Sequence, residues 1–184
     1  MKKKIWILVL FLAILWAVEM VNGLTGHRLS DFGILPREIM GLRGIPLAPF
    51  LHNSVAHLTL NTLPLAVLGG ILMFRGVGTF TKVSLTIILV GGLGVWLFGR
   101  TAIHAGASGL VYGYFGYLVA AGWYERKLRW IFVSILVIVL YGGIARGLLP
   151  LQSHVSWEGH LAGMLAGILA ARTFSPRGKR RSGN

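Results

Sequence analysis

The chain has 184 residues, 55% of them hydrophobic, and a mean hydropathy of +0.73. This composition excludes an ordinary soluble domain and indicates a helical protein that crosses a membrane several times. Cysteine is absent, which excludes disulfides, thiolate nucleophiles and cysteine-bound metals. In such a chain the positions of the basic residues that give the net charge of +13 indicate which loops lie on the cytoplasmic side of the membrane. No nucleic-acid partner is expected.

Six apolar segments predict an all-α membrane protein, a six-transmembrane-helix bundle in a single domain over residues 1–184. The connection 23–51 is expected on the outer side, and the basic segment 174–184 is expected to be a cytoplasmic tail. Most of the 18 lysines and arginines lie on the side of the N-terminus, so both termini are expected in the cytoplasm. The predicted helices are 5–22, 55–74, 80–98, 106–123, 129–146 and 158–173.

The first segment has the basic start and apolar run of a signal peptide. Trp16, Glu19 and Met20 stand where a cleavage site needs small residues, so we expect a retained helix. The following connection is too apolar for a solvated linker, and we expect it to lie against the outer leaflet or the bundle. Within it, Pro36 is expected to open a short helix that ends near Gly41.

The second segment carries two polar side chains on one face, His57 and Asn61, four residues apart and followed by Pro64. Polar groups at that depth must face the bundle interior or water and not lipid. Two uses remain open at this point. The two side chains can form hydrogen bonds between helices, or they can act in a reaction site.

The fourth segment begins with a serine among small residues, because residues 104–116 read His-Ala-Gly-Ala-Ser-Gly-Leu-Val-Tyr-Gly-Tyr-Phe-Gly. If Ser108 lies in the first turn, the helix to Trp123 is about 23 Å long at about 1.5 Å per residue. The hydrocarbon layer is about 30 Å thick, so Ser108 is expected below the outer surface, in a pit open to the outside. The alternative is that these small residues only permit close helix packing.

The sixth segment carries a glycine at every fourth position from Gly159 to Gly167. Such a stripe is typical of a helix contact face, and we expect it to pack against Gly109 and Gly113 of the fourth segment. This packing would bring His160, beside the stripe, close to the start of the fourth helix.

A serine nucleophile needs a base that takes its proton and donors that stabilise the oxyanion. His160 can be the base, while His57, Asn61 and the backbone N–H of Ser108 can be the donors. Tyr112 lies one turn after Ser108 on the same face, so it is expected to pack against the His160 ring.

No carboxylate completes a triad, because Glu158 is two residues from His160 and points to another side of the helix. A Ser-His dyad is therefore the hypothesis. A competing hypothesis is a metal site or ion pathway, but the close His-x-x-x-His spacing typical of catalytic zinc is absent, so no metal is expected. The histidines considered for that site are His52, His57, His104, His154 and His160.

Over roughly residues 49–171 the chain resembles the rhomboid intramembrane serine proteases of the compact bacterial six-helix type. The resemblance implies that Ser108 is the nucleophile and His160 the general base. It places His57 and Asn61 in the oxyanion hole and Tyr112 in the ring-stacking position. The matching motifs are Gly106-Ala107-Ser108-Gly109 for Gly-x-Ser-Gly, His57 to Asn61 for His-x-x-x-Asn, and Gly159-His160 with Gly163 for the helix-six motif.

The resemblance also implies a function, without a cofactor. The expected reaction is hydrolysis of peptide bonds in or near the transmembrane helices of membrane-protein substrates, in the cell membrane, at a site open to the extracytoplasmic side. The alternative is a catalytically inactive relative that binds or escorts membrane proteins. The chain departs from the family at Arg43-Gly44, where the family often has Trp-Arg, so the packing of the outer connection is not implied by the resemblance. The basic tail is expected near anionic inner-leaflet lipid.

Overall fold

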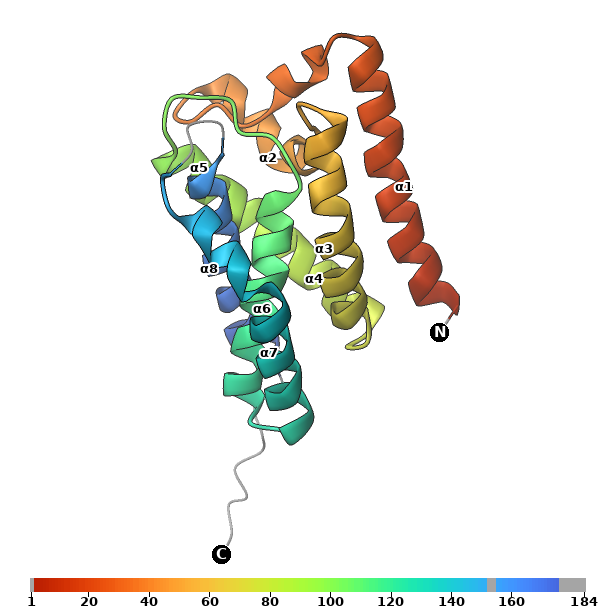
Figure 1. Ribbon diagram of the computed structural model, residues 1–184. Coiled ribbons are helices and arrows are strands. Elements are labelled where there is room, and N and C mark those ends of the chain that lie inside the picture. Colours follow the sequence, from red (N-terminus) through yellow and green to blue (C-terminus); the bar gives the residue numbers. More distant parts are fainter. Residues whose placement is uncertain (1, 152–154, 176–184) are drawn as a thin grey trace, which may run out of the picture.

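The structure is a computed structural model that describes residues 2–151 and 155–175. Within these ranges the chain is helical and forms no β-strand (Figure 1). His154 and the end of the basic tail lie outside the described residues. The long elements are α1 (Lys2–Leu24), α3 (Val55–Met73), α4 (Val77–Thr86), α5 (Gly92–Phe98), α6 (Ser108–Glu125), α7 (Leu128–Tyr141) and α8 (Trp157–Phe174). The shorter ones are η1 (Arg28–Phe32), η2 (Ile39–Arg43), α2 (Gly44–Leu47), η3 (Ala48–Phe50), the π-helix η4 (Ile87–Gly91) and the 3₁₀ helix η5 (Gly142–Leu148).

Helix α6 forms the centre of the bundle and packs mainly on α8, and also on α7 and α3 (Figure 1). Tyr114 and Tyr117 of α6 are buried in the hydrophobic core. The α6–α8 contact is close because a Cβ atom on Gly163 or Gly167 would overlap a backbone carbonyl of α6. The carbonyls concerned belong to Gly109 and Gly113, so the predicted glycine contact is confirmed.

Four helices of the described chain are long and apolar enough to cross a membrane: Lys2–Leu24, Val55–Met73, Val77–Phe98 and Leu128–Leu148. Helices α6 and α8, each of 18 residues, are not among them. Both are rich in glycine and pack mainly on other helices, so neither needs a continuous apolar surface for lipid. Two of the six predicted spans thus lack a strong hydropathy signal.

Several predicted helix ends differ from the structure: the third segment begins at Val77 instead of Phe80, and the fourth begins at Ser108 instead of residue 106. The fifth segment leaves the α conformation at Tyr141 and continues as the 3₁₀ turn η5, since Gly142 and Gly143 in tandem disfavour an α-helix. Helix α6 continues past Trp123 to Glu125, whose buried carboxylate pairs with Arg75.

Residues 25–54 cross one end of the bundle in short turns (Figure 1). They pack against the bundle, as expected, because Arg37 Nη1 donates to the Gly99 carbonyl and Trp96 Nε1 donates to the Glu38 carbonyl. The short helix predicted from Pro36 to Gly41 is wrong. Arg37 has a φ of 63°, which interrupts a right-handed helix, and the 3₁₀ helix begins only at Ile39.

Candidate active site

Ser108 is the first residue of α6 and His160 lies in the first turn of α8. The close α6–α8 contact brings His160 Nε2 within 2.9 Å of Ser108 Oγ, although 52 residues separate them in the chain. His160 is buried and Ser108 is half-buried. A hydroxyl and an imidazole at this distance form the pair that a nucleophilic serine requires.

Tyr112 follows Ser108 by one turn of α6 and stacks on the His160 ring, as the sequence predicts. The ring centroids are 4.0 Å apart and the planes differ by 7°. This parallel contact limits rotation of the imidazole about its side-chain bonds. The plane of His160 is therefore defined by a neighbour on the same helix as Ser108.

The loop before Ser108 passes close to the start of α3. Gly106 has a φ of 128°, which favours glycine, and a Cβ atom there would lie 2.8 Å from His57 Cε1. The His57 ring therefore lies directly against this loop, which the Gly106 N–H anchors through a 2.9 Å hydrogen bond to the Ala48 carbonyl. Gly109, the other small residue of the motif, faces α8.

Asn61 is buried on α3, one turn after His57. Its Nδ2 donates to the His57 carbonyl at 3.1 Å, within its own helix. That bond uses one of the two amide protons and leaves the second for another acceptor. The structure thus places the His57 ring at the loop before Ser108 and ties Asn61 to the same helical turn.

His52 is a site residue that the sequence analysis considered only as a metal ligand. Its fully buried ring accepts a hydrogen bond at Nε2 from the Ala107 N–H, at 3.2 Å. Burial, with a smaller contribution from the neighbouring His57, lowers the pKa of His52 to about 4, so the ring is neutral at pH 7. The position of His52 directly before Asn53 and Ser54, at the polar start of the second segment, was the available signal.

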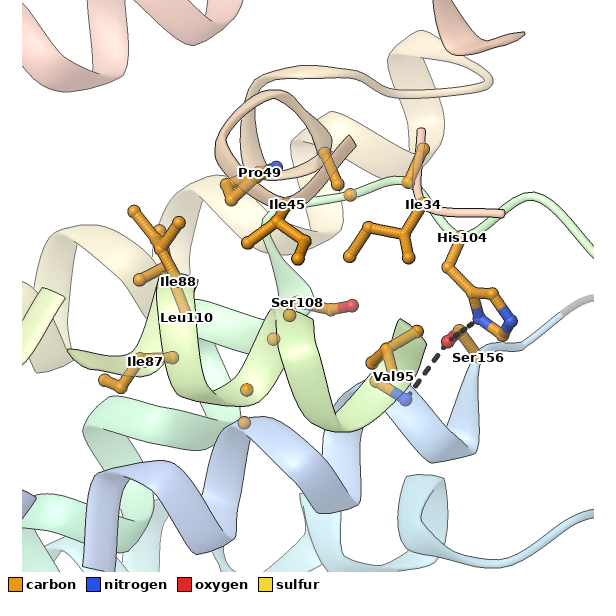
Figure 2. Close-up of a pocket in the computed structure, with 18 residues that line it drawn as sticks. Ile34, Ile45, Pro49, Ile87, Ile88, Val95, His104, Ser108, Leu110 and Ser156 are labelled. Atoms are coloured by element: carbon orange, nitrogen blue, oxygen red, sulfur yellow. Dashed lines mark hydrogen bonds between the residues drawn. The ribbon is translucent and has the colours of Figure 1, made fainter. Parts of the chain in front are cut away.

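The same loop is also tied to the start of α8 (Figure 2). His104 Nε2 lies 3.1 Å from the Arg100 carbonyl, which can only accept, so Nε2 donates. In the neutral ring Nδ1 then accepts from Ser156 Oγ at 2.6 Å, while that oxygen accepts from the Gly159 N–H at 3.1 Å. Burial lowers the pKa of His104, which favours this neutral form.

Glu158 does not bond to His160. Its Oε1 accepts from the Arg100 backbone N–H at 3.3 Å and lies 3.6 Å from Arg100 Nε. The carboxylate therefore faces the loop before Ser108, in agreement with its position on a different side of α8.

A small cavity of about 60 Å³ lies beside Ser108, between α6, α8, residues 34–49 and the segment formed by η4 and α5. Figure 2 shows Ser108 beneath Ile34 and Ile45. The other large side chains of the lining are also apolar, apart from the His104 ring. Such a cavity favours a small apolar group next to the serine.

No three His, Asp or Glu side chains lie close enough to share a metal ion in the part of the chain that the structure describes. His154 of the proposed metal set lies outside that part. The described histidines of that set instead contact backbone groups, serines and one another, as for His52 and His57, whose ring centroids are 5.2 Å apart.

A model of the Rhomboid domain matches residues 40–177. The chain is 40% identical over 174 residues to an uncharacterised protein of Mycobacterium tuberculosis, covering 90% of this chain and 72% of that protein. It is 36% identical to an uncharacterised protein of Mycobacterium leprae, of which it covers 69%. It is also 33% identical over 124 residues to Rhomboid protease GluP of Bacillus subtilis, covering 66% of this chain and 24% of GluP.

Proposed function

The chain belongs to the rhomboid family, and from this premise we propose that it is an intramembrane serine endopeptidase. Its substrates are membrane proteins, cut in or near a transmembrane helix. The observation that carries the proposal is the 2.9 Å contact between His160 Nε2 and Ser108 Oγ, with Tyr112 stacked on the imidazole. A catalytically inactive escort protein would not need this geometry.

In the proposed reaction Ser108 Oγ attacks the scissile carbonyl carbon while His160 Nε2 takes the hydroxyl proton. The carbonyl oxygen becomes an oxyanion, which the Ser108 N–H, the His57 ring and the free amide proton of Asn61 stabilise. The C–N bond then breaks as His160 returns the proton to the leaving amine. Water hydrolyses the resulting acyl-enzyme through the same base, which regenerates Ser108.

The surroundings of Ser108 favour particular substrates. The cavity beside it, of about 60 Å³, suits a small side chain next to the cleaved bond. A peptide bond inside an intact helix is hidden by its own hydrogen bonds and neighbouring side chains, so the substrate must unwind locally before Ser108 reaches it.

The membrane arrangement is part of the proposal. We place six spans in the cell membrane, with α6 and α8 as the inner two, both termini in the cytoplasm and the site open to the extracytoplasmic side. The excess of Lys and Arg in the segments assigned to the inside supports this orientation. The basic tail then lies near anionic inner-leaflet lipid.

A serine-reactive phosphonate tests the proposal without a known substrate. We expect one adduct on detergent-purified protein by intact mass, and none on Ser108→Ala or His160→Ala. Absence of an adduct on folded wild-type protein would contradict the protease assignment and favour the escort function.

A further inference from the structure

The second ring nitrogen of His160 has a defined partner outside α6 and α8. His160 Nδ1 lies 2.8 Å from the carbonyl oxygen of Gly147, near the end of η5. A carbonyl can only accept a hydrogen bond, so Nδ1 carries the proton. In the neutral ring Nε2 is then unprotonated and free to take the Ser108 proton, which is the tautomer that a general base needs.

The same 3₁₀ turn also holds the residue that stacks on His160. The Tyr112 hydroxyl donates to the Ile144 carbonyl at 2.7 Å, one turn before Gly147. Both members of the stacked pair are therefore bonded to backbone carbonyls of η5. The last carbonyls of a helix lack partners within the helix, so the Gly147 oxygen is available for this contact.

The approach of η5 requires glycine at position 147. A Cβ atom on Gly147 would overlap the Tyr112 hydroxyl and lie 3.1 Å from His160 Nδ1. Gly143, in the same turn, is different, because a Cβ atom there meets nothing within 4 Å. Position 147 thus has a steric requirement that the rest of the turn does not share.

We propose that Gly147 is a positioning residue, whose carbonyl serves His160 as a carboxylate serves the histidine of a Ser-His-Asp triad. The carbonyl holds the ring in the Nδ1–H tautomer and keeps accepting that proton while His160 carries a second one in the reaction. The inference rests on the proposed function, and it explains how the site operates although Glu158 is bonded to Arg100.

Phosphonate labelling tests the steric requirement. Gly147→Ala is expected to slow labelling of Ser108 about 100-fold, the effect of roughly 1 Å of misplacement at a reacting group. Gly143→Ala, the matched control, is expected to stay within about twofold of wild type, because its Cβ has open space. Tyr112→Phe combined with Gly147→Ala should label faster than Gly147→Ala alone, since the overlapping hydroxyl is gone. Equal rates for Gly147→Ala and Gly143→Ala would overturn the inference.

A second measurement needs only folded wild-type protein. In ¹⁵N-histidine NMR, with the His160 signals assigned by their loss in His160→Ala, Nδ1 should be protonated and Nε2 unprotonated above the ring's titration range. The opposite tautomer would overturn the inference even if Gly147→Ala fails to fold. Wild-type protein that resists the phosphonate but has the expected tautomer would instead refute the protease assignment alone.

Discussion

At the scale of single residues, the contact between His52 and the loop before Ser108 depends on protonation. Its Nε2 must be unprotonated to accept from the Ala107 N–H, and burial keeps its pKa at about 4, against 6.5 for an unburied histidine. Between these two values the unfolded chain binds more protons than the folded chain. Acidification through this window therefore favours unfolding. The contribution of neutral His52 to the free energy of unfolding is fully present only above about pH 6.5.

We predict that the free energy of unfolding falls as pH decreases from 6.5 to 4, with about 3 kcal/mol of the loss due to His52 at about 1.4 kcal/mol per pKa unit. The measurement is the melting temperature in detergent across this range, for wild type and His52→Gln. Glutamine can accept from the Ala107 N–H without titrating, so the variant should depend less on pH. Identical pH dependence in both proteins would contradict the assigned role.

At the scale of elements, the α6–α8 contact is what assembles the dyad, since each helix contributes one member. The contact depends on glycines that allow backbone to meet backbone. A Cβ atom on Gly167 would overlap the Gly113 carbonyl, whereas a Cβ atom on Gly78 of α4 meets nothing within 4 Å. The two positions therefore differ in packing although both are helical glycines.

Gly167→Ala should destabilise the protein by about 1–3 kcal/mol, the usual cost of overpacking a close contact. Gly78→Ala should leave the melting temperature unchanged or raise it, because alanine is the better helix former by about 1 kcal/mol. Thermal unfolding of both variants in detergent measures this difference. Equal melting temperatures for Gly167→Ala and Gly78→Ala would contradict the prediction, because they would mean that α6 and α8 can move apart to admit a methyl group without loss of stability.

At the scale of the whole molecule, buried charges connect elements at the end of the bundle opposite the dyad. Arg75, between α3 and α4, pairs with Glu125 at the end of α6, and the side chains are only 5% and 1% exposed. The Arg75 guanidinium also lies 4.1 Å from the centroid of the Trp130 ring of α7. One ion pair thus joins the ends of several helices, while Ser108 lies at the other end of α6.

Glu125→Ala should lower stability by about 3–5 kcal/mol, because it leaves Arg75 buried without its counter-ion. The double variant Arg75→Met/Glu125→Leu should be more stable than that single variant, since no unpaired charge remains. Melting temperatures in detergent compare them, and phosphonate labelling of folded protein should be similar in all. If the double variant were less stable than Glu125→Ala, an unpaired buried Arg75 would not be the cause of the loss in Glu125→Ala.

The sequence alone was sufficient to predict the long helices, the rhomboid resemblance and Ser108 and His160 as candidate site residues, but not the path of residues 36–43 or the contacts of His52 and Gly147. Apolar runs of membrane length and glycines at every fourth position can be recognised because the residues that form each pattern are close together in the chain. Such local patterns are therefore readable without the tertiary structure. Ser108 lies in the first turn of α6 and Tyr112 stacks on His160, as predicted, although the helix begins at Ser108 and not at residue 106. The catalytic roles of these residues stay predictions until the labelling experiments.

Only the tertiary structure decided which distant groups meet in the loops. His52 bonds to Ala107 across 55 residues, His104 bonds to Ser156 across 52, and His160 bonds to a carbonyl of Gly147. Loops have no periodicity, and a backbone carbonyl has no residue-type signal. The partner of each buried polar group is therefore whichever group the packing brings within hydrogen-bonding distance, which only the folded chain determines.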